Sequence, residues 1–289
     1  MLGPRDTTAY EWDVEGVTDC ELTFIGTATC LLRLGPFTVL TDPNFLHRGE
    51  RAYLGYGLSS KRLTEPAMTI DQLPELDAIV LSHLHGDHWD RRARHDLDKS
   101  VPVVTTRHAA TYLIRRDKFR DTVGLRTWES HELEKDGQHL RVTSLPGAHS
   151  TNRFLRALLP PVMGSLLELS GPDGAVSARV YLTGDTMLVD GINEIARRHP
   201  DIDMAVVHLG GTTLPGGFVV TMTGAMGVEL LQRVRPRAAV PIHYDDYGIF
   251  KSGLDDFRSA LAGAQLPVDI REVLRGETVP LGSRQRRHF

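Results

Sequence analysis

The chain has 289 residues, 41% of them hydrophobic, and a formal net charge of -4. A chain of this length buries a sizeable core, while its mild negative charge argues against nucleic acid or an anionic membrane surface as the main partner. No stretch approaches the roughly 20 apolar residues that cross a bilayer. The two cysteines have neither CxxC spacing nor the density of a disulfide scaffold, and no signal-peptide pattern is present. We therefore expect a cytoplasmic protein without a transmembrane segment.

The first third of the chain reads as short strands separated by glycine and proline. Apolar and β-branched runs predict strands over 21–25, 29–33, 37–41 and 78–81, with a Gly- and Arg-rich loop over 46–61. Helical spacing follows over 89–97 and 107–116, on either side of a strand over 101–105.

The second half repeats this alternation of strands and helices. Strands are expected over 139–145, 164–169, 178–183, 204–208, 238–242 and 268–273, and helices over 225–235 and 254–262. The pattern predicts an α/β fold with two sheets and helices outside them. Because no repeat, low-complexity tract or Gly/Ser linker divides the chain, we expect one domain over 1–289, with a core over about 20–275 and a tail over 276–289.

Histidines and aspartates stand just after the predicted strands. The string SHLHGDHWD follows the strand over 78–81, and single polar residues follow four other strands, namely Asp42, His149, Asp185 and His243. In a layered α/β fold, strand ends on one edge converge, and ligands and active sites gather there. These residues are therefore expected to meet in space.

The residue types at these positions suit a pair of divalent metal ions. Imidazole nitrogens and carboxylate oxygens bind zinc, iron or manganese without any thiolate. His83 and His85 point the same way from an extended segment, whereas Asp87 and His88 face a second ion in the next turn. His149 and His243 are available to complete the two sets of ligands. Asp185 could offer one oxygen to each ion, as bridging carboxylates do for ions about 3.5 to 4 Å apart.

The string His83-Leu84-His85-Gly86-Asp87-His88 resembles the HxHxDH signature of the metallo-β-lactamase superfamily. The segments DPNFLHRG at 42–49, GDT at 184–186 and VPIHYDDY at 240–247 resemble the branch that contains L-ascorbate-6-phosphate lactonase and N-acyl-phosphatidylethanolamine phospholipase D. The resemblance implies a four-layer αββα sandwich with a dinuclear site. It also implies which residues share each metal: His83, His85 and His149 on one, Asp87, His88 and His243 on the other, with Asp185 between them.

Two divalent cations with Asp87, Asp185 and a bridging hydroxide leave the centre positively charged, which favours anionic substrates and oxyanions. Since zinc lowers the pKa of bound water to roughly 7, hydroxide is available at neutral pH. We expect this hydroxide to cleave a phosphodiester, lactone, ester or amide bond of a small-molecule or lipid-like substrate. Asp87 would orient the nucleophile or pass on its proton. The alternative is an iron-dependent oxidoreductase that uses the same ligands.

Residues around the predicted ligands have two interpretations each. Asp42 is either an acceptor for the free N–H of a metal-binding histidine or the first residue of an Asp-Pro turn. Tyr244 is expected to line the pocket or to donate a hydrogen bond to the oxyanion, unless it belongs to a loop before the next helix. His208 ends a strand on the same edge, so a role in the pocket is considered beside a structural one.

The segment over 150–163 follows His149 and mixes Arg153 and Arg156 with apolar residues. It is either a lid over an amphiphilic or phosphorylated substrate or an amphipathic helix that packs on the body. A departure from the branch occurs at Gly224 and Ala225, where its members often have a proline and a carboxylate. The departure bears on the shape of the substrate pocket.

Overall fold

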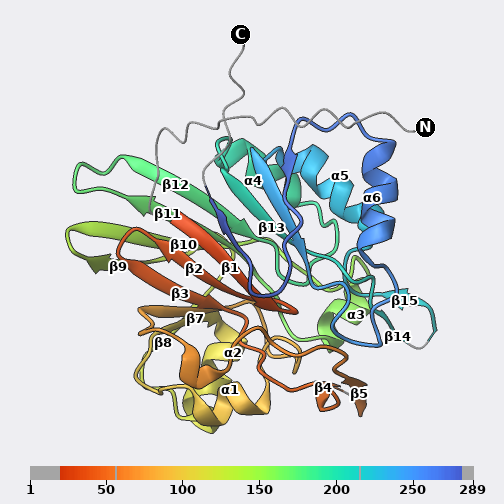
Figure 1. Cartoon of the computed structure of the whole chain (residues 1–289), viewed down its shortest axis with the longest axis horizontal. Helices are drawn as coiled ribbons and strands as arrows, with labels where there is room; N and C mark the ends of the chain where they lie inside the picture. Colours follow the sequence, from red (N-terminus) through yellow and green to blue (C-terminus); the bar gives the residue numbers. More distant parts are fainter. Residues whose placement is uncertain (1–19, 56, 215, 282–289) are drawn as a thin grey trace, which may run out of the picture.

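The computed structural model describes residues 20–55, 57–214 and 216–281. Two seven-stranded sheets lie face to face within these residues (Figure 1). The first has the order β18 (Thr278–Pro280), β1 (Cys20–Gly26), β2 (Thr29–Leu34), β3 (Phe37–Thr41), β6 (Ala78–Leu81), β7 (Val103–Thr106) and β8 (Thr122–Leu125). The second has the order β17 (Asp269–Ile270), β16 (Ala238–Ile242), β13 (Met204–His208), β12 (Val176–Leu182), β11 (Gly164–Ser170), β10 (Gln138–Leu145) and β9 (Ser130–Lys135).

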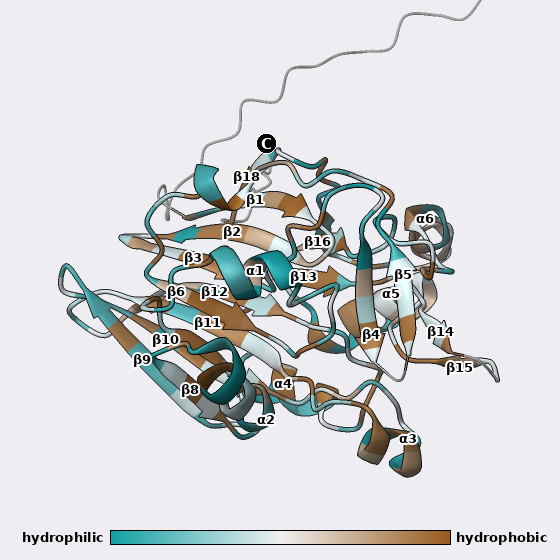
Figure 2. Cartoon of the chain, turned by 90° about the horizontal axis from the view of Figure 1, so that it is seen from below, coloured by the Kyte–Doolittle hydropathy of each residue, from teal (hydrophilic) through white to brown (hydrophobic). Residues whose placement is uncertain are grey.

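Helices cover the outer faces of both sheets (Figures 1 and 2). The first sheet carries α1 (Arg91–Asp96), α2 (Arg107–Tyr112) and the π-helical turn η2 (Leu113–Asp117), and the second carries α4 (Ile192–Arg198), α5 (Gly224–Val234) and α6 (Leu254–Ala262). The remaining elements are the 3-10 turn η1 (Ile70–Gln72), α3 (Arg153–Leu158) and two small hairpins, β4 (Arg51–Gly55) with β5 (Leu58–Lys61) and β14 (Thr213–Leu214) with β15 (Phe218–Val219).

The apolar core has three large clusters because each sheet is buried on both faces, and a small fourth cluster holds Leu46, Ala52 and Tyr247. In β6, Val80 joins a cluster between the sheets that also holds Val206 of β13. Its neighbours Ile79 and Leu81 point the other way, toward α1 and α2, as the two-residue period of a strand requires. A third cluster joins the second sheet to α4, α5 and α6. The predicted αββα sandwich is confirmed.

Several predicted helices and strands have different boundaries in the structure. The helix expected over 89–97 begins at Arg91, because the Asp90 side chain accepts a hydrogen bond from the Ala93 amide and caps it. The strand expected over 268–273 is paired only at Asp269–Ile270. The loop over 46–61 contains the unpredicted hairpin β4–β5. Its pairs are largely polar, such as Arg51 with Lys61, so no apolar alternation marked it in the sequence.

The predicted start of the C-terminal tail, residue 276, is too early in the sequence. Residues Thr278–Pro280 form β18, which pairs antiparallel with β1, and Leu281 is buried in the core between the sheets. The core boundary expected at 275 is therefore corrected to at least residue 281, and 282–289 lie outside the described residues. None of the helices within the described ranges is long and apolar enough to cross a membrane.

The strand directions bring the predicted ligands to one edge of the sandwich. Strand β6 is parallel to β3, and β12, β13 and β16 are mutually parallel. Strand β10 is antiparallel to β11, which is antiparallel to β12, so β10 and β12 end at the same edge. The residues that follow these strands consequently meet.

Candidate metal centre

The loop after β6 is held by its own turn and by the segment after β3. The backbone amides of His88 and Trp89 donate to the carbonyl of His85, at 3.0 and 2.8 Å. Asp90 accepts from the backbone amides of Phe45 and Leu46. Trp89 is fully buried, so the loop cannot move away from the body without opening the core. The loop therefore presents its side chains from a fixed backbone.

The first cluster of side chains contains His83, His85, His149 and Asp185, with one potential ligand atom from each lying within 4.8 Å of the others. His83 Nε2 lies 2.9 Å from His85 Nδ1 and 3.9 Å from Asp185 Oδ2. His83, His149 and Asp185 are buried, and His85 is half-buried. Four residues from three strand ends thus face one point.

The second cluster contains Asp87, His88, Asp185 and His243, again within 4.8 Å. His88 Nε2 lies 3.1 Å from His243 Nε2 and 3.2 Å from Asp185 Oδ2, and His243 Nε2 lies 3.5 Å from Asp87 Oδ2. Asp185 belongs to both clusters. The structure therefore gathers all seven predicted ligands into two adjoining groups.

Four of the imidazoles are oriented by hydrogen-bonding partners at Nδ1. Each Nδ1 lies near a protein oxygen: Ser82 Oγ for His83 at 2.9 Å, Asp42 Oδ2 for His88 at 3.0 Å, Val220 O for His149 at 3.4 Å and Leu209 O for His243 at 3.2 Å. An acceptor at one ring nitrogen fixes the tautomer and leaves the other as a lone-pair donor, as in metal-binding histidines. Nε2 of each ring is thereby left for the cluster.

The buried histidines and aspartates of the two clusters shift one another's pKa values. Burial lowers the pKa of His83, and burial lowers the pKa of His149 to about 3, so both rings are neutral. Burial also disfavours charge on His88, but the carboxylates of Asp185 and Asp42 outweigh it and raise its pKa. Burial acts against ionisation of Asp185 too, yet His243 and His88 lower its pKa. The site therefore buries positive charge on imidazole next to negative charge on carboxylate.

Three buried atoms in these clusters have no hydrogen-bond partner among the described residues, namely Asp87 Oδ1, His149 Nε2 and Asp185 Oδ1. Buried polar atoms are rarely left unsatisfied, since each costs free energy. All three are lone-pair donors that a cation satisfies. Nitrogen and carboxylate donors without sulfur suit zinc, manganese or iron. The residues present therefore fit a pair of divalent metal ions.

Comparison with known proteins places this geometry in a family. Residues 38–244 match the Beta-lactamase superfamily domain. The chain belongs to that superfamily. A UPF0173 metal-dependent hydrolase of Archaeoglobus fulgidus is 28% identical to it over 242 residues, which are 80% of this chain and 95% of the relative. An N-acyl-phosphatidylethanolamine-hydrolyzing phospholipase D of Caenorhabditis elegans is 27% identical over 78% of this chain, and the match spans 64% of that enzyme.

Solved structures share the fold of this superfamily member. A possible metal-dependent hydrolase from Veillonella parvula has a TM-score of 0.75 at 24% sequence identity. The match covers 91% of this chain and 100% of that one. An isothiocyanate hydrolase from Delia radicum gut bacteria has a TM-score of 0.74 at 20% identity, over 91% of this chain and 100% of that one. The predicted family and fold are confirmed, and the relatives' names agree with the predicted enzyme class.

Asp42 is more than a turn former in this superfamily member. Its carboxylate accepts hydrogen bonds from the amide and hydroxyl of Ser82, at 2.6 and 2.9 Å, and contacts His88. Burial raises its pKa, but the charges and hydrogen bonds of His88 and His208 outweigh burial and lower the pKa to about 2. His208 is buried and lies behind His88, with Nε2 3.6 Å from Asp42 Oδ2 and Nδ1 3.2 Å from Thr183 Oγ1. Asp42 thus contacts His88 directly, whereas His208 contacts Asp42 and stacks against the His88 ring, with ring centroids 5.8 Å apart.

The other two peripheral residues lie differently. Tyr244 packs against the cluster between the second sheet and its helices, and burial raises its pKa to about 12. This position gives no support to a role in the pocket. Arg153 begins the exposed helix α3. No residue of that helix is fully buried and Leu155 is half-buried, so the lid and the packing helix both stay predictions.

Sequence reasoning missed a buried ion pair beside the centre. Arg62 and Asp246 are both fully buried, with Arg62 Nη2 3.7 Å from Asp246 Oδ1. Asp246 also accepts from the Thr27 amide at 2.7 Å and pairs with Arg275 at 3.0 Å. This network ties the segment after His243 to the ends of β1 and β5. In the sequence Asp246 lies within the segment over 240–247 and Arg62 follows the loop over 46–61, and neither position reveals its partner.

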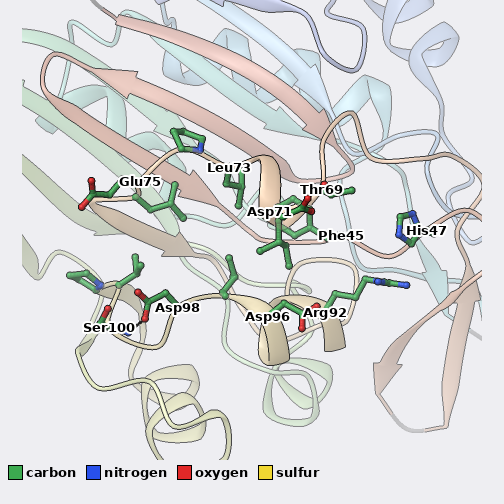
Figure 3. A pocket seen from close by; sticks show the side chains of 16 residues that line it. Phe45, His47, Thr69, Asp71, Leu73, Glu75, Arg92, Asp96, Asp98 and Ser100 are labelled. Carbon is green, nitrogen blue, oxygen red and sulfur yellow. Dashed lines mark hydrogen bonds between the residues drawn. The ribbon is translucent and has the colours of Figure 1, made fainter.

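A separate cleft of about 670 Å³ lies beside α1 (Figure 3). Its lining includes Phe45, Asp71, Glu75, Asp96 and Asp98 and none of the seven predicted ligands. The figure shows side chains from the segment around η1 facing those of the α1 region across it. This cleft is therefore distinct from the candidate metal centre.

Proposed function

We propose that this protein is a hydrolase that uses two divalent metal ions. The proposed metal is zinc, with manganese or iron as alternatives. His83, His85 and His149 would hold one ion, Asp87, His88 and His243 the other, and Asp185 would bridge them. The observation that carries the proposal is Asp185, which belongs to both buried clusters. The anchored Nδ1 atoms of four histidines support it further.

The metal ions and the protein side chains would contribute different parts of the reaction. Bound ions would polarise a carbonyl or phosphoryl oxygen and lower the pKa of water. Asp87, whose Oδ2 lies 3.5 Å from His243 Nε2, would bind an ion through one carboxylate oxygen, and its other oxygen would accept the nucleophile's proton and return it to the leaving group. Asp42 holds His88 in place. Asp185 keeps negative charge between the two histidine groups, which limits their mutual repulsion.

Within hydrolysis, we favour a phosphodiester or a lactone over other esters and amides. The named relative from Caenorhabditis elegans hydrolyses N-acyl-phosphatidylethanolamine, and a positively charged centre suits an anionic group. The proposed substrate is thus a small or lipid-like anion, met in the cytoplasm. Cleavage of neutral amides alone would contradict this choice.

A hydrolysis screen tests the proposal. Protein purified without added metal is analysed for metal content and then assayed with zinc, manganese and iron on phosphodiesters, lactones and acylated amines. His83→Ala should lose one ion and all turnover, whereas His108→Ala, which removes an exposed histidine, should change neither. Turnover that survives His83→Ala would point to a contaminant and reject the assignment.

The same preparation tests the iron-dependent oxidoreductase. The diiron β-hydroxylase of Streptomyces venezuelae shares the fold, with a TM-score of 0.60 at 17% identity over 91% of this chain and 54% of that one. Because such similarity shows fold alone, metal content must decide. Stoichiometric iron with oxygen consumption would overturn the hydrolytic proposal.

A further inference from the structure

Two elements that carry exposed aromatic side chains contact the loops of the metal centre. In β4, the carbonyl of Tyr53 accepts a hydrogen bond from the amide of Gly86, at 2.9 Å, within the ligand loop, and the Tyr53 side chain is 61% exposed. Phe218 of β15 is 48% exposed and stands two residues before Val220, whose carbonyl lies 3.4 Å from His149 Nδ1. Both hairpins therefore border the centre.

Helix α3 is the third such element and begins four residues after His149. Phe154 and Leu158 are one helical turn apart and share a face, with exposures of 71% and 44%. Arg153 and Arg156 lie three residues apart on the opposite face and are also exposed. Figures 1 and 2 both show α3 and the two hairpins on the same side of the molecule.

The concentration of these side chains distinguishes them from ordinary surface apolar residues. Exposed apolar side chains scattered singly are normal, whereas several around one site indicate a binding surface. Here Tyr53 and Phe218 come from two hairpins that contact the ligand loops or stand next to a residue that does, and Phe154 comes from the helix that follows His149 by four residues. We define these three residues with Leu158 as the apolar rim. An apolar ligand gains free energy by covering such a surface.

We propose that the apolar rim binds the hydrocarbon chain of an anionic amphiphile whose charged group lies at the metal centre. This inference rests on the proposed function, since the same centre would act on that group. Arg153 and Arg156 give the short helix that carries Phe154 and Leu158 a positive charge, which suits an anionic ligand, and the rim suits the hydrocarbon chain of that ligand. The rim is thereby a determinant of specificity, separate from the catalytic residues.

Binding of n-alkylphosphonates to the zinc-loaded full chain tests this proposal. Isothermal titration calorimetry would compare ethyl, butyl, hexyl and octyl phosphonates, all as monomers. We expect the affinity to rise about two- to four-fold per methylene while the added carbons contact the rim. Phe154→Ser and Phe218→Ser should flatten this dependence and leave ethylphosphonate binding unchanged. Ile114→Ser, at an exposed apolar residue of η2, should preserve it.

The outcomes separate this proposal from the proposed function. Equal affinity for all four phosphonates, or no binding of any, would overturn the apolar rim as a ligand site even if hydrolysis is found. Chain-length dependence in a protein that hydrolyses nothing would uphold the rim and reject the function. Sedimentation velocity on the same variants covers the remaining case: a dimer that Phe154→Ser dissociates would show that a second copy covers the rim, and would overturn the proposal.

Discussion

Asp42 holds His88 from a backbone conformation that few residues adopt, with φ of +38°. Asparagine tolerates such a conformation nearly as well, so Asp42→Asn removes the charge without forcing a change of backbone. We expect metal affinity to fall about 10- to 100-fold, as is usual when the partner of a ligating histidine is lost. Competition with a chromophoric chelator measures this.

A matched control exists for that substitution. Asp136 also has a positive φ, of +52°, but it lies exposed in a turn between β9 and β10. Asp136→Asn should leave metal affinity unchanged. If both variants bind metal like the wild type, Asp42 has no role in the centre beyond its turn.

Gly86 shows how a residue without a side chain shapes the centre. A Cβ atom there would lie 2.6 Å from the carbonyl oxygen and 2.7 Å from the amide nitrogen of Tyr53. Gly86→Ala must push the hairpin or the ligand loop aside, at about 1–3 kcal/mol of unfolding free energy. Urea denaturation should show this loss, together with weaker metal binding. Gly248→Ala is the control, because a Cβ there meets nothing within 4 Å.

At the scale of elements, the Arg62–Asp246 pair links the segment after β16 to that after β5. Asp246→Asn leaves Arg62 buried without its countercharge, and such losses cost about 3–5 kcal/mol. Glu21→Gln removes the exposed partner of Arg33 and should cost less than about 1 kcal/mol. Chemical denaturation of the two variants decides between a buried network and an ordinary surface pair.

The same pair predicts a dependence on pH. Burial raises the pKa of Asp246, but the hydrogen bond and charge of Arg275 and the charge of Arg62 lower it below its usual range. A carboxylate with a depressed folded pKa contributes stability that is present above its unfolded pKa, roughly 3.9, and lost as pH falls further. The difference in stability between wild type and Asp246→Asn should therefore shrink on acidification below about pH 4. A constant difference would contradict this origin.

The contact between α5 and α6 explains the departure at Gly224. A Cβ at this residue would lie 2.3 Å from the amide nitrogen of Phe257, and the Gly224 amide donates to Ser252 Oγ at 2.9 Å. Proline has a Cβ and lacks the N–H, so it does not fit here. The departure from the branch thus serves helix packing, and Ala225 next to it is exposed.

For the whole molecule, metal removal should lower stability. Ions that bind only the folded chain stabilise it by mass action, by about 2.7 kcal/mol at one hundred times the dissociation constant. Thermal denaturation with EDTA should therefore give a lower Tm than with zinc, by several degrees for a chain of this size. His83→Ala should reduce the difference. Equal Tm values with and without chelator would show that the clusters hold no ion.

The sequence by itself determined the fold class, the superfamily and the seven candidate ligands. Apolar runs such as 37–41 and 78–81 are set by local periodicity, and each ligand stands directly after such a run or within a few residues of it. Strand ends on one edge must converge, so the order of ligands along the chain was enough to predict their meeting.

Only the tertiary structure decided which partners complete the centre. The hairpin β4–β5 has polar pairs and is stabilised by a hydrogen bond from the backbone of Gly86. The role of Asp246 is to pair with Arg62, which stands 184 positions earlier in the sequence. The exposure of Phe154 likewise depends on what the rest of the chain leaves uncovered. Such contacts join residues far apart in sequence, and local pattern carries no information about which distant groups will share their surroundings.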